Sequence, residues 1–197
     1  CQDPTRKQEL LQIASNCTRV PAKGARNFYE ACQSFWFVQQ LIQMESSGHS
    51  ISPGRFDQYM YPYYKSDMEA GNLTREFAQE LMDCIWVKLN DLNKCRDAAS
   101  AEGFAGYSLF QNLIVGGQNK YGEDVTNDLS FMCIEASKQV FLPQPSLSIR
   151  VWNGSPHELL MKAADLTRTG IGLPAYYNDE VIIPALQNRG LTLEDAR

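Results

Sequence analysis

Apolar residues recur at three- and four-residue spacing along much of this 197-residue chain, which predicts a helix-rich protein. The strongest such stripe lies at residues 27–45 and includes Phe28 and Phe35. Trp36 and Phe37 widen it until the segment is apolar nearly all round, so we expect a deeply buried helix there. Other helices are predicted at residues 5–16, 63–70, 75–92, 126–140, 156–169 and 179–188, and a further one starts after Thr192.

Capping residues mark several ends of these helices. Thr74 is a suitable N-cap for residues 75–92, and Ser155 with Glu158 has the spacing of a capping box. Residues 93–108 are polar and rich in glycine, which predicts irregular chain. The residues expected to end the preceding helices are Gly71, Gly170 and Gly190.

Three short segments have the character of β-strands. Residues 110–115 give a strand signal that ends at Gly116, and residues 175–177 form a shorter strand. Residues 145–152 alternate with period two, which places serine and arginine side chains on one face and aliphatic side chains on the other. Because strands alternate with helices, the sequence predicts a helix-rich α/β fold with a partly parallel sheet. Residues 1–197 show no internal repeat, and we expect a single segment without an internal boundary.

Composition narrows the class of protein. Hydrophobic residues make up 44% and charged residues 21% of the chain, as in ordinary globular proteins. The net charge of −5, with no basic stripe, argues against a nucleic-acid partner. No apolar run reaches the roughly 18 residues that a membrane span needs, so we expect no membrane partner. The six cysteines contain no C-x-x-C pair, which favours free thiols in a cytoplasmic protein over disulfides or a metal site.

The loop at residues 48–64 carries the densest set of polar side chains. It places His49, one of two histidines, beside Ser50, and Arg55 and Asp57 follow within eight positions. Glycine and proline punctuate the loop, which lies between two predicted helices. A polar loop held between buried elements is a common place for a binding site.

This run and several later segments together resemble the glycyl radical enzyme family, the relatives of pyruvate formate-lyase. The later segments, in the same order along the chain, are residues 86–90, 110–118, 142–148, 174–180 and 188–197. The resemblance covers essentially the whole chain. It implies a slice of a ten-stranded α/β barrel, built from two five-stranded parallel half-sheets ringed by helices, and thus an internal fragment of a longer enzyme.

The resemblance also implies radical chemistry. A partner activating enzyme that uses S-adenosylmethionine and an iron–sulfur cluster installs a glycyl radical, which generates a cysteine thiyl in the barrel. Both the thiyl cysteine and the radical glycine are expected beyond Arg197, so the chain by itself is expected to be inactive. Cys133 and Glu135 share the Cys-x-Glu spacing of the family motif, but they lie in a predicted helix without a preceding glycine. We therefore expect no catalytic role for Cys133.

Three residues are candidate substrate contacts. His49 and Ser50 resemble the His-Ser pair that binds substrate hydroxyls in cobalamin-independent glycerol and propanediol dehydratases, and Phe110 matches an aromatic that lines the substrate pocket. The alternatives are that His49 caps the preceding helix and that Phe110 is an ordinary core residue. Leu109 stands where the hydroxyproline dehydratase type carries Asp, which speaks against that substrate.

Arg55 and Asp57 are expected to support the loop by pairing with each other rather than by touching substrate. The tyrosines of the loop are interpreted as packing residues with bonded hydroxyls. Polar residues of the predicted strands are expected to make structural hydrogen bonds.

The resemblance predicts a radical 1,2-elimination, with dehydration of glycerol or propane-1,2-diol as the first choice. Choline trimethylamine-lyase and a formate acetyltransferase-like enzyme are alternatives within the family. A non-catalytic helical binding or assembly domain is the alternative from another class. The enzyme reading implies anaerobic metabolism, a small-molecule substrate, the activating enzyme as partner, and a homo-oligomer in the cytoplasm.

Overall fold

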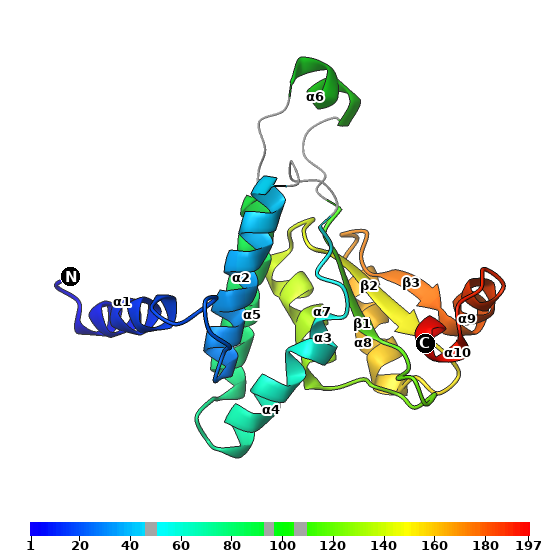
Figure 1. Cartoon of the computed structure of the whole chain (residues 1–197), viewed down its shortest axis with the longest axis horizontal. Coiled ribbons are helices and arrows are strands. Elements are labelled where there is room, and N and C mark those ends of the chain that lie inside the picture. The colour runs from blue at the N-terminus through cyan, green and yellow to red at the C-terminus, as the bar shows by residue number, and fades with distance from the viewer. Residues whose placement is uncertain (46–50, 93–96, 105–109) are drawn as a thin grey trace.

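The structure is a computed structural model that describes residues 1–45, 51–92, 97–104 and 110–197. Long helices form one side of the molecule, and a small parallel sheet with its covering helices forms the other (Figure 1). The helices are α1 (Pro4–Cys17), α2 (Phe28–Glu45), α3 (Phe56–Tyr59), α4 (Tyr61–Glu69), α5 (Arg75–Asp91), α6 (Ala98–Phe104), α7 (Asp128–Val140), α8 (His157–Thr167), α9 (Asp179–Gln187) and α10 (Leu193–Ala196). The strands are β1 (Asn112–Gly116), β2 (Ser146–Val151) and β3 (Ala175–Asn178).

The sheet is parallel throughout, in the order β1-β2-β3. Leu113 pairs with Leu147 and Val115 with Ile149, so the buried aliphatic face of β2 continues onto β1. A parallel bridge between Gly54 and Leu113 adds the loop segment 51–54 to the free edge of β1. The prediction of a helix-rich α/β fold with parallel strands is confirmed.

The core lies between the sheet and α5, α7 and α8. Leu113, Leu147 and Ile149 of the sheet are fully buried, and so is Trp86 of α5. The Trp86 indole donates a hydrogen bond of 2.8 Å to the hydroxyl of Ser137 on α7, which satisfies its one polar atom inside the core. The close-packed core formed with α5, α7 and α8 therefore holds the edge and the strand ends of the sheet in place.

The α2 helix is less buried than its sequence predicts. Val38, Leu41, Ile42 and Met44 are exposed, although the half that includes Phe28 is buried. In the part of the chain that the structure describes, α1, α4 and α5 contact α2, and these contacts do not bury the four apolar side chains. The expectation of a helix buried all round is wrong for this chain.

Three local predictions also differ from the structure. Helical turns begin at Phe56, earlier than predicted, and α6 occupies part of the segment expected to be irregular. The capping box before α8 does not form, because the Ser155 hydroxyl accepts a hydrogen bond of 3.0 Å from the Trp152 N–H instead. Pro156 takes the N-cap position and makes no side-chain capping bond.

Two regions leave apolar or strand surface exposed. α1 projects away from the body of the molecule, and its Leu10 and Leu11 are exposed (Figure 1). All four residues of β3 are exposed, including Tyr176 and Tyr177.

None of the helices in the described ranges is long and apolar enough to span a bilayer.

Candidate functional site

The loop segment 51–54 is held against β1 by backbone hydrogen bonds. The Gly54 N–H donates to the Asn112 carbonyl at 3.1 Å, and the Ile114 N–H donates to the Gly54 carbonyl at 2.7 Å. Gly54 has φ of +68°, a backbone conformation that favours glycine. The chain leaves the sheet edge there and enters α3.

The structure places only part of the predicted substrate set. His49 and Ser50 lie outside the described residues, which resume at Ile51. Phe110 lies just before β1, with φ of +49° and 49% of its surface exposed. It is therefore not packed in the core of this chain, and the strand begins two residues later than predicted.

Ser52 links the loop to the backbone around Phe110. Its hydroxyl donates to the Phe110 carbonyl at 3.3 Å and accepts from the Asn112 N–H at 3.2 Å. Sequence reasoning missed this residue, because a serine before Pro-Gly is typical of a turn and says nothing of partners about 60 positions away.

A buried amide network lies behind the same junction. The Gln39 amide on α2 donates to the Ile51 carbonyl at 2.8 Å and to the Gln111 side-chain oxygen at 3.2 Å. Gln111, fully buried, donates in turn to the Leu89 carbonyl at 2.8 Å. Its backbone N–H donates to the side chain of Gln144 at 3.4 Å. Three glutamines thus tie the loop, α5 and the start of β1 together.

Arg55 binds backbone carbonyls at the far end of β1. Its guanidinium donates to Gly116 at 3.3 Å, to Gln118 at 3.1 Å and to Arg197 at 3.5 Å. Burial lowers the pKa of Arg55, and the nearby positive charge of Arg150 lowers it further. In the described ranges Arg55 and Asp57 hydrogen-bond to other groups and form no direct ion pair, although their opposite charges still attract each other.

Asp57 is fully buried at the start of α3. One carboxylate oxygen accepts hydrogen bonds from the Gly116 N–H at 2.9 Å and from the Ser130 hydroxyl at 2.5 Å. Burial raises the pKa of Asp57, although these two bonds favour the ionised carboxylate. The Asp57 carbonyl also accepts from the Asn127 side chain at 3.0 Å, which ties the loop exit to the start of α7.

An ion pair between β2 and α9 stiffens the same end of the sheet. Arg150 on β2 donates to the two carboxylate oxygens of Asp179 at 2.7 and 2.8 Å, and Asp179 is almost wholly buried. Gly117 makes room for this arginine: a Cβ added there would lie 2.8 Å from the Arg150 Nε, and its φ of +86° also favours glycine. The pair joins β2 to the start of α9.

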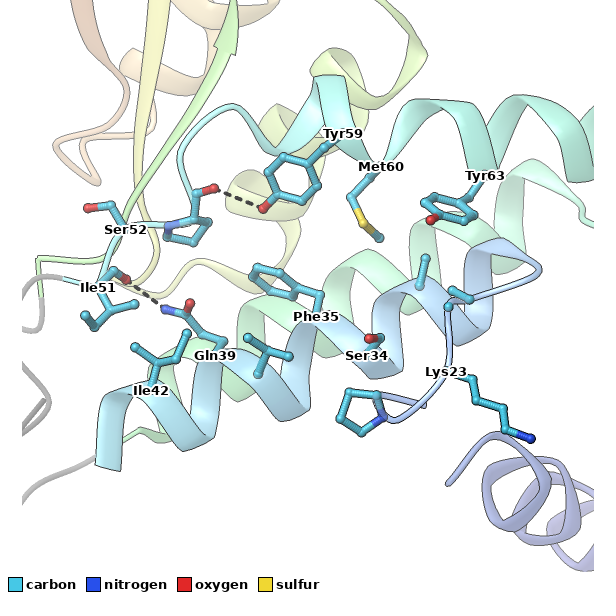
Figure 2. A pocket seen from close by; sticks show the side chains of 16 residues that line it. Lys23, Ser34, Phe35, Gln39, Ile42, Ile51, Ser52, Tyr59, Met60 and Tyr63 are labelled. Carbon is cyan, nitrogen blue, oxygen red and sulfur yellow. Dashed lines mark hydrogen bonds between the residues drawn. The ribbon is translucent and has the colours of Figure 1, made fainter. Parts of the chain in front are cut away.

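A groove of about 560 Å³ runs between α2 and the loop (Figure 2). Figure 2 shows the Gln39 amide reaching the Ile51 carbonyl and the Tyr59 hydroxyl reaching the Pro53 carbonyl, a bond of 3.0 Å. Burial raises the pKa of Tyr59, so its hydroxyl stays protonated as a donor. The described lining contains no carboxylate or imidazole, and it suits packing rather than acid–base chemistry.

Cys133 lies buried in the middle of α7. Burial raises the pKa of its thiol well above the usual value, and the carboxylate of Asp57 adds to this effect. A thiol kept protonated inside the core is a poor nucleophile.

Comparison with known proteins gives the setting for this site. The sequence model of the family described as pyruvate formate lyase-like matches residues 1–197. A solved structure from work on 1,2-propanediol dehydration in Roseburia inulinivorans is 75% identical to this chain, with a TM-score of 0.97. The match covers 100% of this chain and 25% of that one. The glycerol-bound glycerol dehydratase from Clostridium butyricum is 63% identical with a TM-score of 0.95, also over 100% of this chain and 25% of that one.

More distant relatives share the same region. An isethionate sulfite-lyase from Desulfovibrio desulfuricans is 39% identical over 98% of this chain and 24% of its own length. The chain thus spans about a quarter of the length of the relatives it matches. A glycyl radical enzyme from Archaeoglobus fulgidus is 34% identical with a TM-score of 0.94, over 99% of this chain and 25% of its own. With its full length matched, the chain belongs to the pyruvate formate lyase-like family.

Proposed function

We propose that this chain forms part of the substrate side of a glycyl radical dehydratase that acts on propane-1,2-diol or glycerol. The main support is sequence identity. This chain is 75% identical to the structure concerned with 1,2-propanediol dehydration and 63% identical to the glycerol-bound glycerol dehydratase. It falls to 34% for the hydroxyproline dehydratase of Clostridioides difficile. Leu109, in place of the Asp expected for that substrate, agrees with the same choice.

The residues of the loop suit a diol. A 1,2-elimination of water needs directional hydrogen bonds that hold both hydroxyls, and an imidazole beside a hydroxyl, as in His49 and Ser50, provides them. Phe110 presents an exposed aromatic ring near the same loop, where it would exclude water from a reactive intermediate. Arg55 and Asp57 fix the loop to the sheet without facing substrate.

The radical would come from parts of the parent enzyme outside these 197 residues. A glycyl radical installed by an S-adenosylmethionine-dependent activating enzyme would supply the hydrogen abstraction, through a cysteine expected beyond Arg197. This chain binds and orients the diol and excludes water.

An independent helical binding domain is not favoured, because the family match extends over all 197 residues. We place the parent enzyme in the cytoplasm as a homo-oligomer, with residues 1–197 as one segment of its barrel.

A chimera tests this proposal. Residues 1–197 replace the matching quarter of the Clostridium butyricum glycerol dehydratase, and the protein is activated anaerobically with its activating enzyme. We expect turnover of propane-1,2-diol and glycerol to their aldehydes, and no turnover of choline. In the control, the corresponding segment of the Clostridioides difficile hydroxyproline dehydratase fills the same place and should abolish diol turnover. A folded chimera with a normal glycyl radical signal but no diol turnover would refute the proposal.

A further inference from the structure

Phe110 is held in an unusual backbone conformation. Its φ of +49° lies in the left-handed region, which bulky side chains rarely occupy. Such a conformation is strained and persists only where the surroundings enforce it. Half of the side chain is nevertheless exposed, so core packing does not account for the strain.

The hydroxyl of Ser52 supplies one of the enforcing contacts. It donates to the Phe110 carbonyl at 3.3 Å and accepts from the Asn112 N–H at 3.2 Å. The same Asn112 N–H also donates to the Phe110 carbonyl at 3.0 Å, which closes a tight turn around Gln111. A single hydroxyl thus bridges the two backbone groups on either side of this turn.

The residue at the centre of the turn is fixed from the opposite side. Gln111 is fully buried, and its side chain bonds to Gln39 at 3.2 Å and to the Leu89 carbonyl at 2.8 Å. Gln39 also holds the carbonyl of Ile51, the residue before Ser52, at 2.8 Å. Both sides of the loop-to-strand junction are therefore anchored to α2 and α5, and little freedom is left for Phe110.

We infer that Ser52 is a positioning residue, which fixes the Phe110 ring relative to the loop that follows His49 and Ser50 and so sets the fit of the diol. The kinetic part of this inference rests on the proposed function, whereas the structural part does not. Without the hydroxyl, the Phe110 carbonyl loses one of its donors, and the backbone is free to relax toward negative φ. The ring would then move, and the site would bind both diols less well.

The test uses the chimera and its Ser52→Ala variant. We expect the KM for propane-1,2-diol to rise about tenfold, with kcat and the glycyl radical content little changed, since one pair of hydrogen bonds is lost. Ser52→Thr keeps the hydroxyl and should restore a KM near that of the parent. Ser66→Ala, which removes an exposed hydroxyl on α4, is the matched control and should leave KM unchanged.

A crystal structure of the unactivated Ser52→Ala chimera gives a readout that needs no turnover. We expect Phe110 to leave the left-handed region or its ring to change position, and Ser52→Thr to keep both. If Phe110 keeps its conformation in the Ser52→Ala protein, the inference is overturned, whether or not the chimera is active. An unchanged KM in an active Ser52→Ala chimera would overturn it as well. Inactivity of the parent chimera, by contrast, counts against the proposed function alone.

Discussion

The Asp57 carboxylate accepts a hydrogen bond of 2.9 Å from the backbone N–H of Gly116, 59 residues further along the chain. The same oxygen accepts from the Ser130 hydroxyl, so a single buried atom joins the loop exit, the end of β1 and the start of α7. Arg55, two residues earlier, reaches the Gly116 carbonyl at 3.3 Å. The end of the first strand is therefore held through both its N–H and its C=O by the loop that carries the candidate substrate contacts.

Removal of the Asp57 carboxylate should destabilise the chimera strongly. Asp57→Ala leaves the Gly116 N–H and the Ser130 hydroxyl buried without their acceptor, and we expect a loss of about 3 kcal/mol in the free energy of unfolding. Asp57→Asn keeps an acceptor oxygen and should lose about half as much. Urea unfolding followed by circular dichroism measures both. Asp165→Ala, at an exposed position on α8, is the control, and an equal effect at Asp57 and Asp165 would contradict the buried role.

The ion pair between Arg150 and Asp179 should be costly to break from one side. Arg150→Ala leaves the almost wholly buried carboxylate without a partner, and we expect a loss of about 3–5 kcal/mol. Arg150→Lys keeps the positive charge but cannot form the bidentate hydrogen bonds, so its loss of stability should be smaller than that of Arg150→Ala. The double variant Arg150→Met with Asp179→Leu should recover much of the stability. Denaturant unfolding decides this: a double variant no more stable than Arg150→Ala would argue against an unpaired charge as the cause.

Local patterns predicted the helices well, because helix ends depend on neighbouring residues. Thr74 was expected to cap α5, and its hydroxyl accepts from the Phe77 N–H at 3.2 Å. Long-range partners were not predictable in this way. Gln39 and Gln111 are 72 residues apart, and no periodicity signals that two amides will meet. The hydrogen bonds that join Ser52 to Phe110 and Asn112 could not be predicted for the same reason.

Burial was the weaker part of the sequence reasoning. The apolar stripe around α2 predicted a helix covered on all sides, but Val38 and Leu41 are exposed. A hydrophobic pattern shows that a face needs a partner, and it does not show whether that partner lies in the same 197 residues. The direct ion pair expected for Arg55 and Asp57 does not form, because Arg55 donates to the Gly116 carbonyl while Asp57 accepts from the Gly116 N–H.

Acid should weaken the turn before α2 through Glu30. Hydrogen bonds from the Arg26 guanidinium and backbone N–H hold the pKa of this carboxyl below its usual value, against the opposing effect of burial. A lowered pKa in the folded state contributes stability above the unfolded pKa of about 4.3, and this contribution is lost as the pH falls through the folded pKa. Glu30→Gln should therefore be less stable at pH 7 and less sensitive to acid below about pH 4.3.

Thermal unfolding between pH 3 and pH 7 checks this dependence. Glu76→Gln, at an exposed position on α5, serves as the control and should follow the parent curve. Parallel curves for Glu30→Gln and the parent protein would show that Glu30 does not contribute to acid sensitivity.

The 197-residue chain in isolation should associate. Exposed apolar side chains on α2, including Val38 and Leu41, and the uncovered strand β3 offer surface for another chain. We expect light scattering to show species larger than a monomer. The double variant Val38→Asp, Leu41→Asp should shift the population toward monomer. The pair Asn72→Asp, Gln187→Asp adds the same charge at exposed polar positions and should not. A clean monomer of the unaltered chain would refute this prediction.

The two histidines of the chain provide the most direct test of the proposed substrate role. His49 lies in the loop that resembles the diol-binding pair, whereas His157 is exposed at the start of α8. In the activated chimera, we expect His49→Ala to lower kcat/KM for propane-1,2-diol about a hundredfold, with the glycyl radical signal intact. His157→Ala should retain the parent value. If the two variants turn over propane-1,2-diol equally well, the loop does not contact the substrate and the account is wrong.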